Sequence, residues 1–352
     1  MALALSVVRG PLPDRDLDAI AATYGARDAR YAQRGFLATL FNENPFGFSV
    51  HAFLCDGNEV VGHYAEIPIR VQARGATVTS GKGEALFLAE RHRKTAVSTP
   101  GGEALPALAM MNAVHERALN EGCAFLHCIT NPGVGMLLRM RGFKALRLDR
   151  PERQFLPEAA TGRRLWSRAS AWRAVSAGQR FLLGGARSWL RTTAGPAVEI
   201  DSPAHADFHL EALAAAAPGD TGAWSISRDI ETLRWMRRLG RLQFVSVEGE
   251  PERFACVTTG HTREIVLWSV PPGDRRIALA ILCGLLGASV RDGARSVALP
   301  RHLASSEDPS LRNLPRWLGF LSRQVPITLY VKSRDSFYLE PGNVAFDRLF
   351  NL

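Results

Sequence analysis

The spacing of apolar residues divides the first 150 residues into helices and strands. A period of three to four predicts helices, and strict alternation predicts strands. In chain order we predict a first strand at the N-terminus, helices over 14–24 and 29–42, strands over 49–55, 59–72 and 83–90, a helix over 104–121 and a strand over 123–129. Asp56-Gly57 and Arg74-Gly75 mark turns of an antiparallel meander. This order predicts an α+β fold with a parallel pair of strands in its middle.

The same order of elements returns after Pro203. We predict helices over 204–216 and 228–239, strands over 241–248, 253–260 and 264–270, a helix over 275–291, a strand over 295–300, a helix through Leu311 and Leu314, and a strand over 324–331. Two short helices end at equivalent points, in Arg141-Gly142-Phe143 and Leu318-Gly319-Phe320. The repeat predicts two lobes of one fold, residues 1–150 and 201–352, joined by a basic helical linker over 151–200.

The segment from the strand 83–90 to the strand 123–129 is a parallel crossover, whose ligand site lies where strand ends meet a helix N-terminus. Backbone N–H groups there suit a phosphate. We expect Thr99, Gly101 and Gly102 to lie ahead of the helix, with Arg93 and Lys94 as charge partners. The alternative is that Thr99 only caps the helix and the glycines form a tight turn.

Composition places the chain among ordinary soluble proteins. Its 352 residues are 46% hydrophobic and 22% charged, and the length favours two domains. No stretch approaches the roughly 18 apolar residues of a membrane span, and the N-terminus lacks the basic region of a signal peptide. Five scattered cysteines fit buried thiols in a reducing compartment, so we expect a cytoplasmic protein.

The excess of 43 basic over 34 acidic residues, a net charge of +9, is concentrated in the linker. Residues 161–193 hold seven arginines and no acid, interleaved with Trp166, Trp172, Phe181 and Trp189. Three interpretations stay open: a connecting helix whose aromatic residues pack on the lobes, a helix on an anionic membrane surface, or a grip on a nucleotide or carrier-protein phosphate. Nucleic-acid binding has thin support without a folded recognition motif. We expect no metal, since His205 and His209 lack a third ligand.

The first half resembles the GNAT superfamily of acyl-CoA-dependent N-acyltransferases. The resemblance rests on the strand Ala85–Glu90, the loop Arg91–Gly102, the helix after it, the strand ending at Asn131, and the closing Leu137–Phe143. It extends more weakly over 200–352 and implies a tandem protein of two GNAT-like lobes. Each lobe should hold a mixed, mostly antiparallel sheet with a central parallel splice, flanked by helices. Two departures stand out: Arg93–Ser98 lacks the expected loop glycines, and Leu138 replaces the tyrosine that often protonates the leaving thiolate.

Acyl transfer to an amine needs a donor site and a general base, and the base should lie at a strand end. Our candidates for catalysis are Glu90, which closes the central strand, His92 beside it, and Glu66 on the preceding hairpin strand. For the donor they are Phe87, Leu88, Arg93, Lys94, Thr99, Gly101, Gly102 and Asn131. The alternatives are a surface Glu90 paired with Arg93, a solvent-facing Glu66, and an Asn131 that only forms a turn before Pro132.

The resemblance therefore implies an N-acyltransferase that moves an acyl group by direct attack to an amine of a small molecule. The donor would be acetyl-CoA, a longer acyl-CoA or the phosphopantetheine of an acyl carrier protein, and the N-terminal lobe would bind it. Two alternatives remain. One is an inactive tandem protein that binds an acyl thioester or a partner protein, and the other is a transferase that uses aminoacyl-tRNA.

Overall fold

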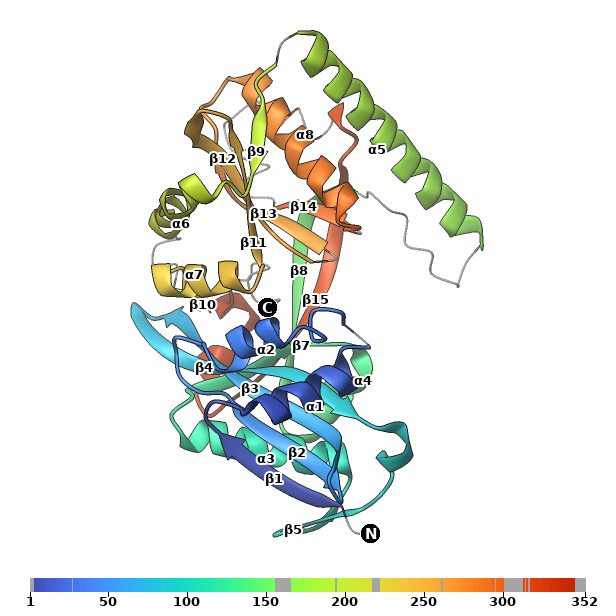
Figure 1. The fold of residues 1–352 in the computed structure, drawn as a ribbon, viewed down its shortest axis with the longest axis vertical. Coiled ribbons are helices and arrows are strands. Elements are labelled where there is room, and N and C mark those ends of the chain that lie inside the picture. Colours follow the sequence, from blue (N-terminus) through green and yellow to red (C-terminus); the bar gives the residue numbers. More distant parts are fainter. Residues whose placement is uncertain are drawn as a thin grey trace. The chain divides into compact units, whose positions relative to one another are not determined.

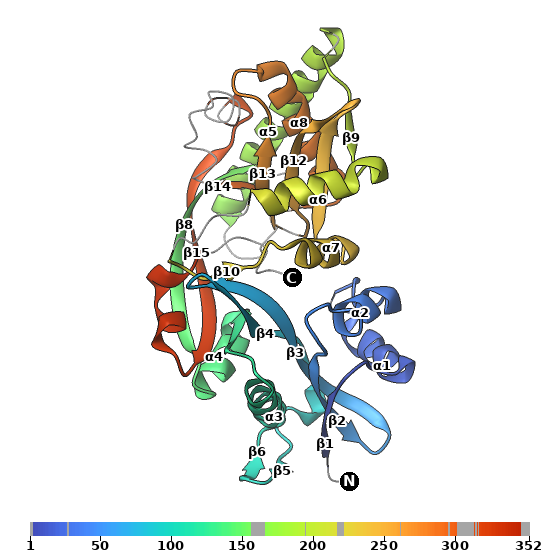
Figure 2. The same ribbon diagram turned by 90° about the vertical axis from the view of Figure 1, so that its left-hand side faces the viewer.

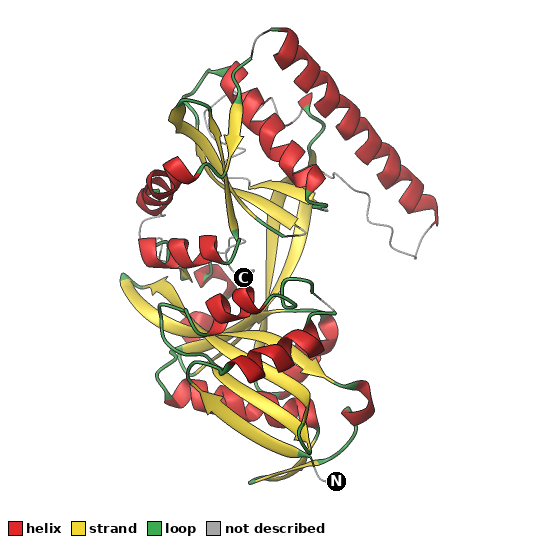
Figure 3. Cartoon of the chain, in the orientation of Figure 1, coloured by secondary structure: helices red, strands yellow, loops and turns green. Residues whose placement is uncertain are grey.

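The chain forms two compact units in the computed structural model, which describes residues 3–345 apart from 27, 156–165, 194, 217–221, 261, 295, 301–312, 314 and 316. Unit 1 comprises Met1–Leu148, Pro218–Ser227 and Ile327–Phe346, and unit 2 comprises Asp149–Ala217, Arg228–Pro326 and Asp347–Leu352. The lobes predicted from the sequence are contiguous, whereas unit 1 includes two segments of the C-terminal half. Both units combine helices with a mixed sheet (Figures 1 and 3), so the α+β class is confirmed.

An antiparallel meander forms most of the unit 1 sheet. It contains β1 (Ala4–Arg9), β2 (Val50–Asp56), β3 (Glu59–Ala73) and β4 (Ala76–Leu88), paired in chain order. Arg74 and Gly75 join β3 to β4 with φ angles of 50° and 74°. Two left-handed residues are what a two-residue hairpin turn requires, so the predicted turn is confirmed. β4 starts well before the predicted strand 83–90, because it forms the whole second arm of this hairpin.

Helices cover both faces of the unit 1 sheet (Figure 2). α1 (Asp14–Tyr24) and α2 (Arg34–Phe41) lie on one face, and α3 (Pro106–Asn120) and α4 (Pro132–Met140) lie on the other. Neighbouring residues of β3 show the alternation: the His63 ring contacts Phe41 of α2, and the Tyr64 ring contacts His115 of α3. α2 is shorter than the predicted helix 29–42, since the residues just before it form turns.

One strand of the unit 1 sheet comes from the C-terminal half of the chain. β7 (Phe125–Ile129) runs parallel to β4 on one side. On its other side it pairs antiparallel with residues 329–333 of β15 (Leu321–Ser333). The predicted strand 324–331 is therefore present, and its final part belongs to the sheet of the N-terminal half. The short β10 (Ser225–Ile226) pairs with β3 in the same unit.

Unit 2 repeats this plan. β9 (Val198–Ile200), β11 (Leu242–Val247), β12 (Glu250–Thr258) and β13 (Thr262–Ser269) pair antiparallel, and β14 (Ser296–Pro300) runs parallel to β13. β14 also pairs with the far end of β8 (Lys144–Phe155), a strand that the sequence did not predict. α8 (Arg275–Arg291) packs against one face of this sheet, and α6 (Ala206–Ala215) contacts the other face through the His209 ring. α7 (Ile230–Arg238) precedes β11. The predicted helix through Leu311 and Leu314 lies outside the described residues.

The two glycine-phenylalanine landmarks have the same structural role. Gly142 and Gly319 adopt φ angles of 82° and 80°, the left-handed conformation, and Gly142 follows the end of α4. Phe143 and Phe320 follow them into the core of their own units, at 4% and 6% exposure. A left-handed glycine before a buried phenylalanine and a parallel splice in both units confirm the tandem architecture.

Candidate functional site

In unit 1 the two parallel strands part soon after they meet. Pairing between β4 and β7 covers two residue pairs, residues 81–82 with residues 126–127. β4 continues to Leu88 while paired with β3 on its other side, and β7 continues to Ile129 while paired with β15. Beyond the second pair no ladder joins β4 to β7. The carboxyl-terminal halves of the two strands therefore separate.

A bulge in β4 lies where the strands separate. Ala85 has a φ of 54°, an unusual value for a residue with a β-carbon, and the β3–β4 register shifts opposite it. His63 Nδ1 lies 3.2 Å from the Ala85 carbonyl oxygen. A carbonyl oxygen can only accept, so His63 Nδ1 carries the proton and donates it. This hydrogen bond holds the bulge from the face that α1 and α2 cover.

A second buried histidine fixes the first. His51 Nδ1 lies 3.1 Å from His63 Nε2, and the two rings stack between Phe41 and Phe53. Burial lowers the pKa of His63 to about 4, although its bond to the carbonyl favours the protonated ring. Burial also lowers the pKa of His51 well below its usual value, with the neighbouring His63 as a smaller cause. Since both rings are neutral, His51 donates to His63, and His63 donates to the bulge.

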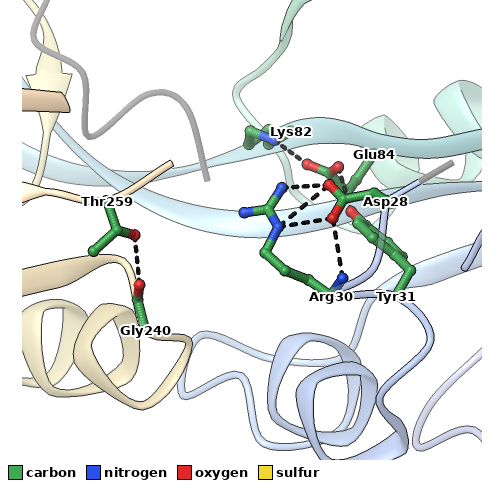
Figure 4. A network of polar contacts seen from close by, with 7 residues as sticks. All are labelled: Asp28, Arg30, Tyr31, Lys82, Glu84, Gly240 and Thr259. Carbon is green, nitrogen blue, oxygen red and sulfur yellow. Dashed lines mark hydrogen bonds and ion pairs between the residues drawn. The ribbon is translucent and has the colours of Figure 1, made fainter. Parts of the chain in front are cut away.

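The residue before the bulge is a carboxylate in a polar network (Figure 4). Tyr31 donates its phenolic proton to Glu84 Oε1 at 2.5 Å, and Lys82 forms an ion pair with Glu84 Oε2. Arg30 binds Asp28 beside them through two nitrogens. The side chains of Lys82 and Glu84 are 7% and 15% exposed. The network therefore holds a carboxylate in place next to the bulge, with part of its surface exposed.

Glu66 lies on the opposite face of the sheet, in the core. Tyr64 donates a hydrogen bond of 2.7 Å to Glu66 Oε1, and His115 Nε2 of α3 lies 3.2 Å from the same oxygen. Glu66 is 2% exposed, and its Oε2 lies so close to Gly81 that a β-carbon there would be 2.9 Å away. The solvent-facing alternative for Glu66 is therefore wrong. Two glycines in β4, at 81 and 83, make room for this buried triad.

Glu90 and His92 lie beyond the end of β4, in a single 3₁₀ turn (Glu90–His92). The Glu90 side chain is 88% exposed and lies 3.7 Å from Arg93, which is the surface pairing considered above. His92 Nε2 lies 3.6 Å from Asp56 and accepts a hydrogen bond from Arg91. Glu66 and Glu90 are thus in different environments, one in the core and one in solvent.

The loop before α3 is built differently from the prediction. β5 (Val97–Thr99) and β6 (Gly102–Ala104) form a small hairpin, and Thr99 donates a hydrogen bond of 2.7 Å to the Gly102 carbonyl across it. Thr99 therefore does not cap a helix, and Gly101 lies in the hairpin turn. The predicted helix 104–121 starts two residues late, because Pro106 is preorganised for the first helical position.

The true start of α3 has no side-chain cap. Leu105 occupies the N-cap position and offers no acceptor to the first N–H groups of the helix. The preceding loop carries Arg93 and Lys94, both exposed. An uncapped helix start with basic residues nearby in sequence remains suited to an anion. In unit 2 the corresponding helix α8 is capped by Asp274, whose carboxylate accepts from the Ile277 N–H at 3.2 Å.

Asn131 is the N-cap of α4, where its side-chain oxygen accepts from the Val134 N–H at 3.0 Å. Asn131 therefore caps a helix in addition to preceding Pro132, and this cap already engages its side-chain oxygen. Leu88 packs in the core below α3, and Phe87 faces the other side of β4. Leu138 is fully buried in α4. The phenol that approaches α4 belongs to Tyr330 of β15, which lies against Gly135.

Sequence reasoning missed Glu84 and the pair His51–His63. The signal for Glu84 was present in Gly81-Lys82-Gly83-Glu84, where two opposite charges share one face of a strand. The histidine pair had no such signal. Its role depends on the bond from His63 to the Ala85 carbonyl, and that bond requires a bulge in β4 that no local sequence pattern marks.

Comparisons with known proteins bear on the fold. No protein-family model matches the sequence, and no curated protein matches it. Among solved structures, a probable N-acyltransferase of unknown function from Enterococcus faecalis V583 matches with a TM-score of 0.52 at 11% identity, over 96% of this chain and 74% of that chain. A GCN5-related N-acetyltransferase from Kribbella flavida matches with a TM-score of 0.50 at 14% identity, over 96% and 73%. Another from Anabaena variabilis gives 0.50 at 11%, over 95% and 74%. The chain thus has the GCN5-related N-acetyltransferase fold.

Proposed function

We propose, from this N-acetyltransferase fold, that the chain transfers an acyl group from a phosphopantetheine thioester to an amine of a small molecule. The donor would be acetyl-CoA, a longer acyl-CoA or an acylated carrier protein. The observation that carries the proposal is the separation of β4 from β7 beside the Ala85 bulge in unit 1. Unit 2 has a parallel splice as well, but Asp274 puts a negative charge at the start of its helix.

The donor would lie along the edge of β4 that has no ladder to β7. A pantetheine arm contains two amide groups, and an extended chain with amides can add to a sheet edge as a further strand. The thioester carbonyl would then lie next to the bulge, where backbone N–H groups are turned out of the regular ladder. Such groups can stabilise the oxyanion that develops when the amine attacks.

The amine would attack from the side of Glu84. An ammonium group must lose a proton before its nitrogen can attack, and a carboxylate beside the bulge can accept that proton. The nitrogen then bonds to the thioester carbon, the carbon–sulfur bond breaks, and the pantetheine thiolate leaves. A thiol has a pKa near 8.5, so the thiolate leaves without a strong acid beside it. A buried leucine at position 138 is compatible with this step.

We assign the base to Glu84 in preference to the carboxylates considered first. Glu66 is in the core at 2% exposure, below α3, where a substrate amine has no access to its carboxylate. Glu90 is in solvent, where an ion pair is weak and a carboxylate keeps little of the positioning that catalysis needs. Glu84 combines partial exposure with fixed hydrogen-bonding partners.

The test compares Glu84→Gln with Glu90→Gln as the matched control. Thiol release from acetyl-CoA and longer acyl-CoAs is measured over a panel of amines, with donor affinity measured by calorimetry. We expect Glu84→Gln to lower kcat/KM by about 10²- to 10⁴-fold with donor affinity unchanged, and Glu90→Gln to leave both unchanged. Full activity in Glu84→Gln would contradict the assignment of the base. Donor binding without turnover by the unaltered protein would contradict the enzymatic proposal itself.

A further inference from the structure

The long basic helix α5 (Trp166–Thr192) packs on unit 2 through one face of its described part, residues 177–192. Leu183 and Ala186 join the core formed with α8, and they are 4% and 0% exposed. Arg187 donates to the Cys283 carbonyl of α8 at 3.1 Å, and Gln179 donates to the Gly319 carbonyl at 2.6 Å. These contacts fix how the helix is rotated about its axis, and so they define which side chains face outward.

The outward face of α5 is apolar. Phe181 is 81% exposed, Trp189 is 45% exposed and Leu182 is 37% exposed. Between them Gly184 and Gly185 have nothing within 4 Å of an added β-carbon, so no other part of the described chain covers this face. A phenylalanine exposed to this extent in a packed helix indicates an interaction surface.

Arginines border this face along one rim. Arg180 and Arg191 are exposed and lie about three helical turns apart, on the same side of the helix. Trp189 and Leu182 are about two turns apart and form the opposite rim. No acidic residue occurs in residues 161–193, where seven arginines are present. The surface therefore combines positive charge with exposed aromatic rings.

We propose that α5 binds the surface of an anionic lipid bilayer. Helices that lie in the membrane interface place aromatic and leucine side chains among the acyl chains and basic residues among the headgroups. The indole of Trp189 suits the boundary between the two layers, and the arginine stems let the charges reach the phosphates. No helix in the described part of the chain is long and apolar enough to cross a membrane. The contact would thus bring the protein to the membrane surface.

An acidic carrier protein or an RNA would use the same positive charge, but neither accounts as well for the apolar part. Phe181 protrudes from a helix face beside two glycines, and this convex face offers no pocket to a protein partner. RNA binding would need aromatic rings presented with charges on one folded platform. A bilayer needs neither, because lipid molecules rearrange around each side chain.

The experiment is flotation of the full chain with phosphatidylcholine vesicles, with and without about one-third phosphatidylglycerol. We expect binding to the anionic vesicles only, weakening as salt rises. Phe181→Ala should lower the partition constant by about tenfold or more, and Phe208→Ala, an aromatic residue 46% exposed on α6, should not change it. Arg180→Glu should lower it by about fivefold or more, whereas Arg15→Glu, whose side chain is 86% exposed on α1, should not.

Circular dichroism and thermal unfolding establish that each variant is folded. Absence of binding to anionic vesicles would overturn the proposal. An equal loss in Arg15→Glu would also overturn it, since attraction would then depend on net charge alone, and an equal loss in Phe208→Ala would show that any exposed aromatic residue serves as well. If the protein did not bind vesicles but bound an acidic carrier protein or tRNA, and Phe181→Ala and Arg180→Glu weakened that binding, the surface would be assigned to that partner instead.

Discussion

At the scale of single residues, three buried histidines set the properties of unit 1. His63 holds the Ala85 bulge, His51 holds His63, and His127 lies on the same face near Trp224. None of them is a metal ligand or a catalytic group in our account. The neutral rings of His51 and His63 act as fixed donors below α1 and α2, and the His127 ring packs against Trp224.

The bond from His63 to the bulge predicts a contrast between two amides. In His63→Asn the amide nitrogen can take the place of Nδ1, and the bond to the Ala85 carbonyl is retained. In His63→Gln the donor is displaced toward the position of Nε2, and the bond is lost. We expect kcat to fall by about tenfold or more in the glutamine variant and much less in the asparagine variant.

The donor affinity of both variants, measured by calorimetry, separates positioning from folding. If the bulge places the thioester carbonyl, the affinity should change little in either. Equal losses of kcat in both variants would show that the histidine only fills space.

The lowered pKa values predict that acid destabilises unit 1. The pKa is about 4 for His63 and about 3 for His127, against 6.5 for an unperturbed histidine, and burial is the main cause of both shifts. Below pH 6.5 the unfolded chain therefore takes up protons that the folded chain does not. The free energy of unfolding should fall as pH decreases from about 6.5 to about 4, by up to about 1.4 kcal/mol per pH unit for each histidine.

Well above pH 6.5 both states leave these histidines neutral, so they should not contribute to the pH dependence of the free energy of unfolding. Urea unfolding at a series of pH values gives the slope of the free energy of unfolding against pH. His127→Phe should reduce this slope by the contribution of one histidine. An unchanged slope in that variant would show that His127 does not take part.

At the scale of elements, the sequence predicted the types and order of most helices and strands, but not all their ends. Hairpin turns and helix ends were predictable because glycines with left-handed φ angles mark them, as at Gly75 and Gly142. The start of α3 was not, because the β5–β6 hairpin uses the same Thr-Pro-Gly-Gly residues that resemble a helix start. β8 was missed, because its arginine-rich sequence shows no clear alternation.

The uncapped start of α3 predicts how the donor is recognised. In Leu105→Asp the new carboxylate would accept the first N–H groups of the helix and repel a phosphate there. We expect stability to rise by about 1 kcal/mol and acetyl-CoA affinity to fall by about tenfold or more. Acetyl-pantetheine, which lacks the diphosphate, should bind as before, and Leu105→Ala should resemble the unaltered protein. Unchanged acetyl-CoA affinity in the aspartate variant would show that the start of α3 does not hold the diphosphate.

At the scale of the whole molecule, the sequence predicted two copies of one fold but not how the chain is shared between them. The last part of β15 was assigned to the C-terminal lobe, because it follows that lobe in sequence. In the structure it pairs with β7, whose outer edge would otherwise have no partner strand. No local pattern specifies a pairing between strands so far apart in the chain. The candidate site divides in the same way: the parallel crossover was predictable, and the contacts across the sheet were not.

The central claim is that β4 and β7 of unit 1 separate to hold a pantetheine arm. Hydrogen exchange of the full chain, with and without saturating acetyl-CoA, tests it most directly. The account predicts slower exchange, by about tenfold or more, for amides in residues 84–88 and 128–131, with no change in residues 265–269 of β13. Acetyl-CoA binding with unaltered exchange in residues 84–88, or with protection confined to β13, would contradict it.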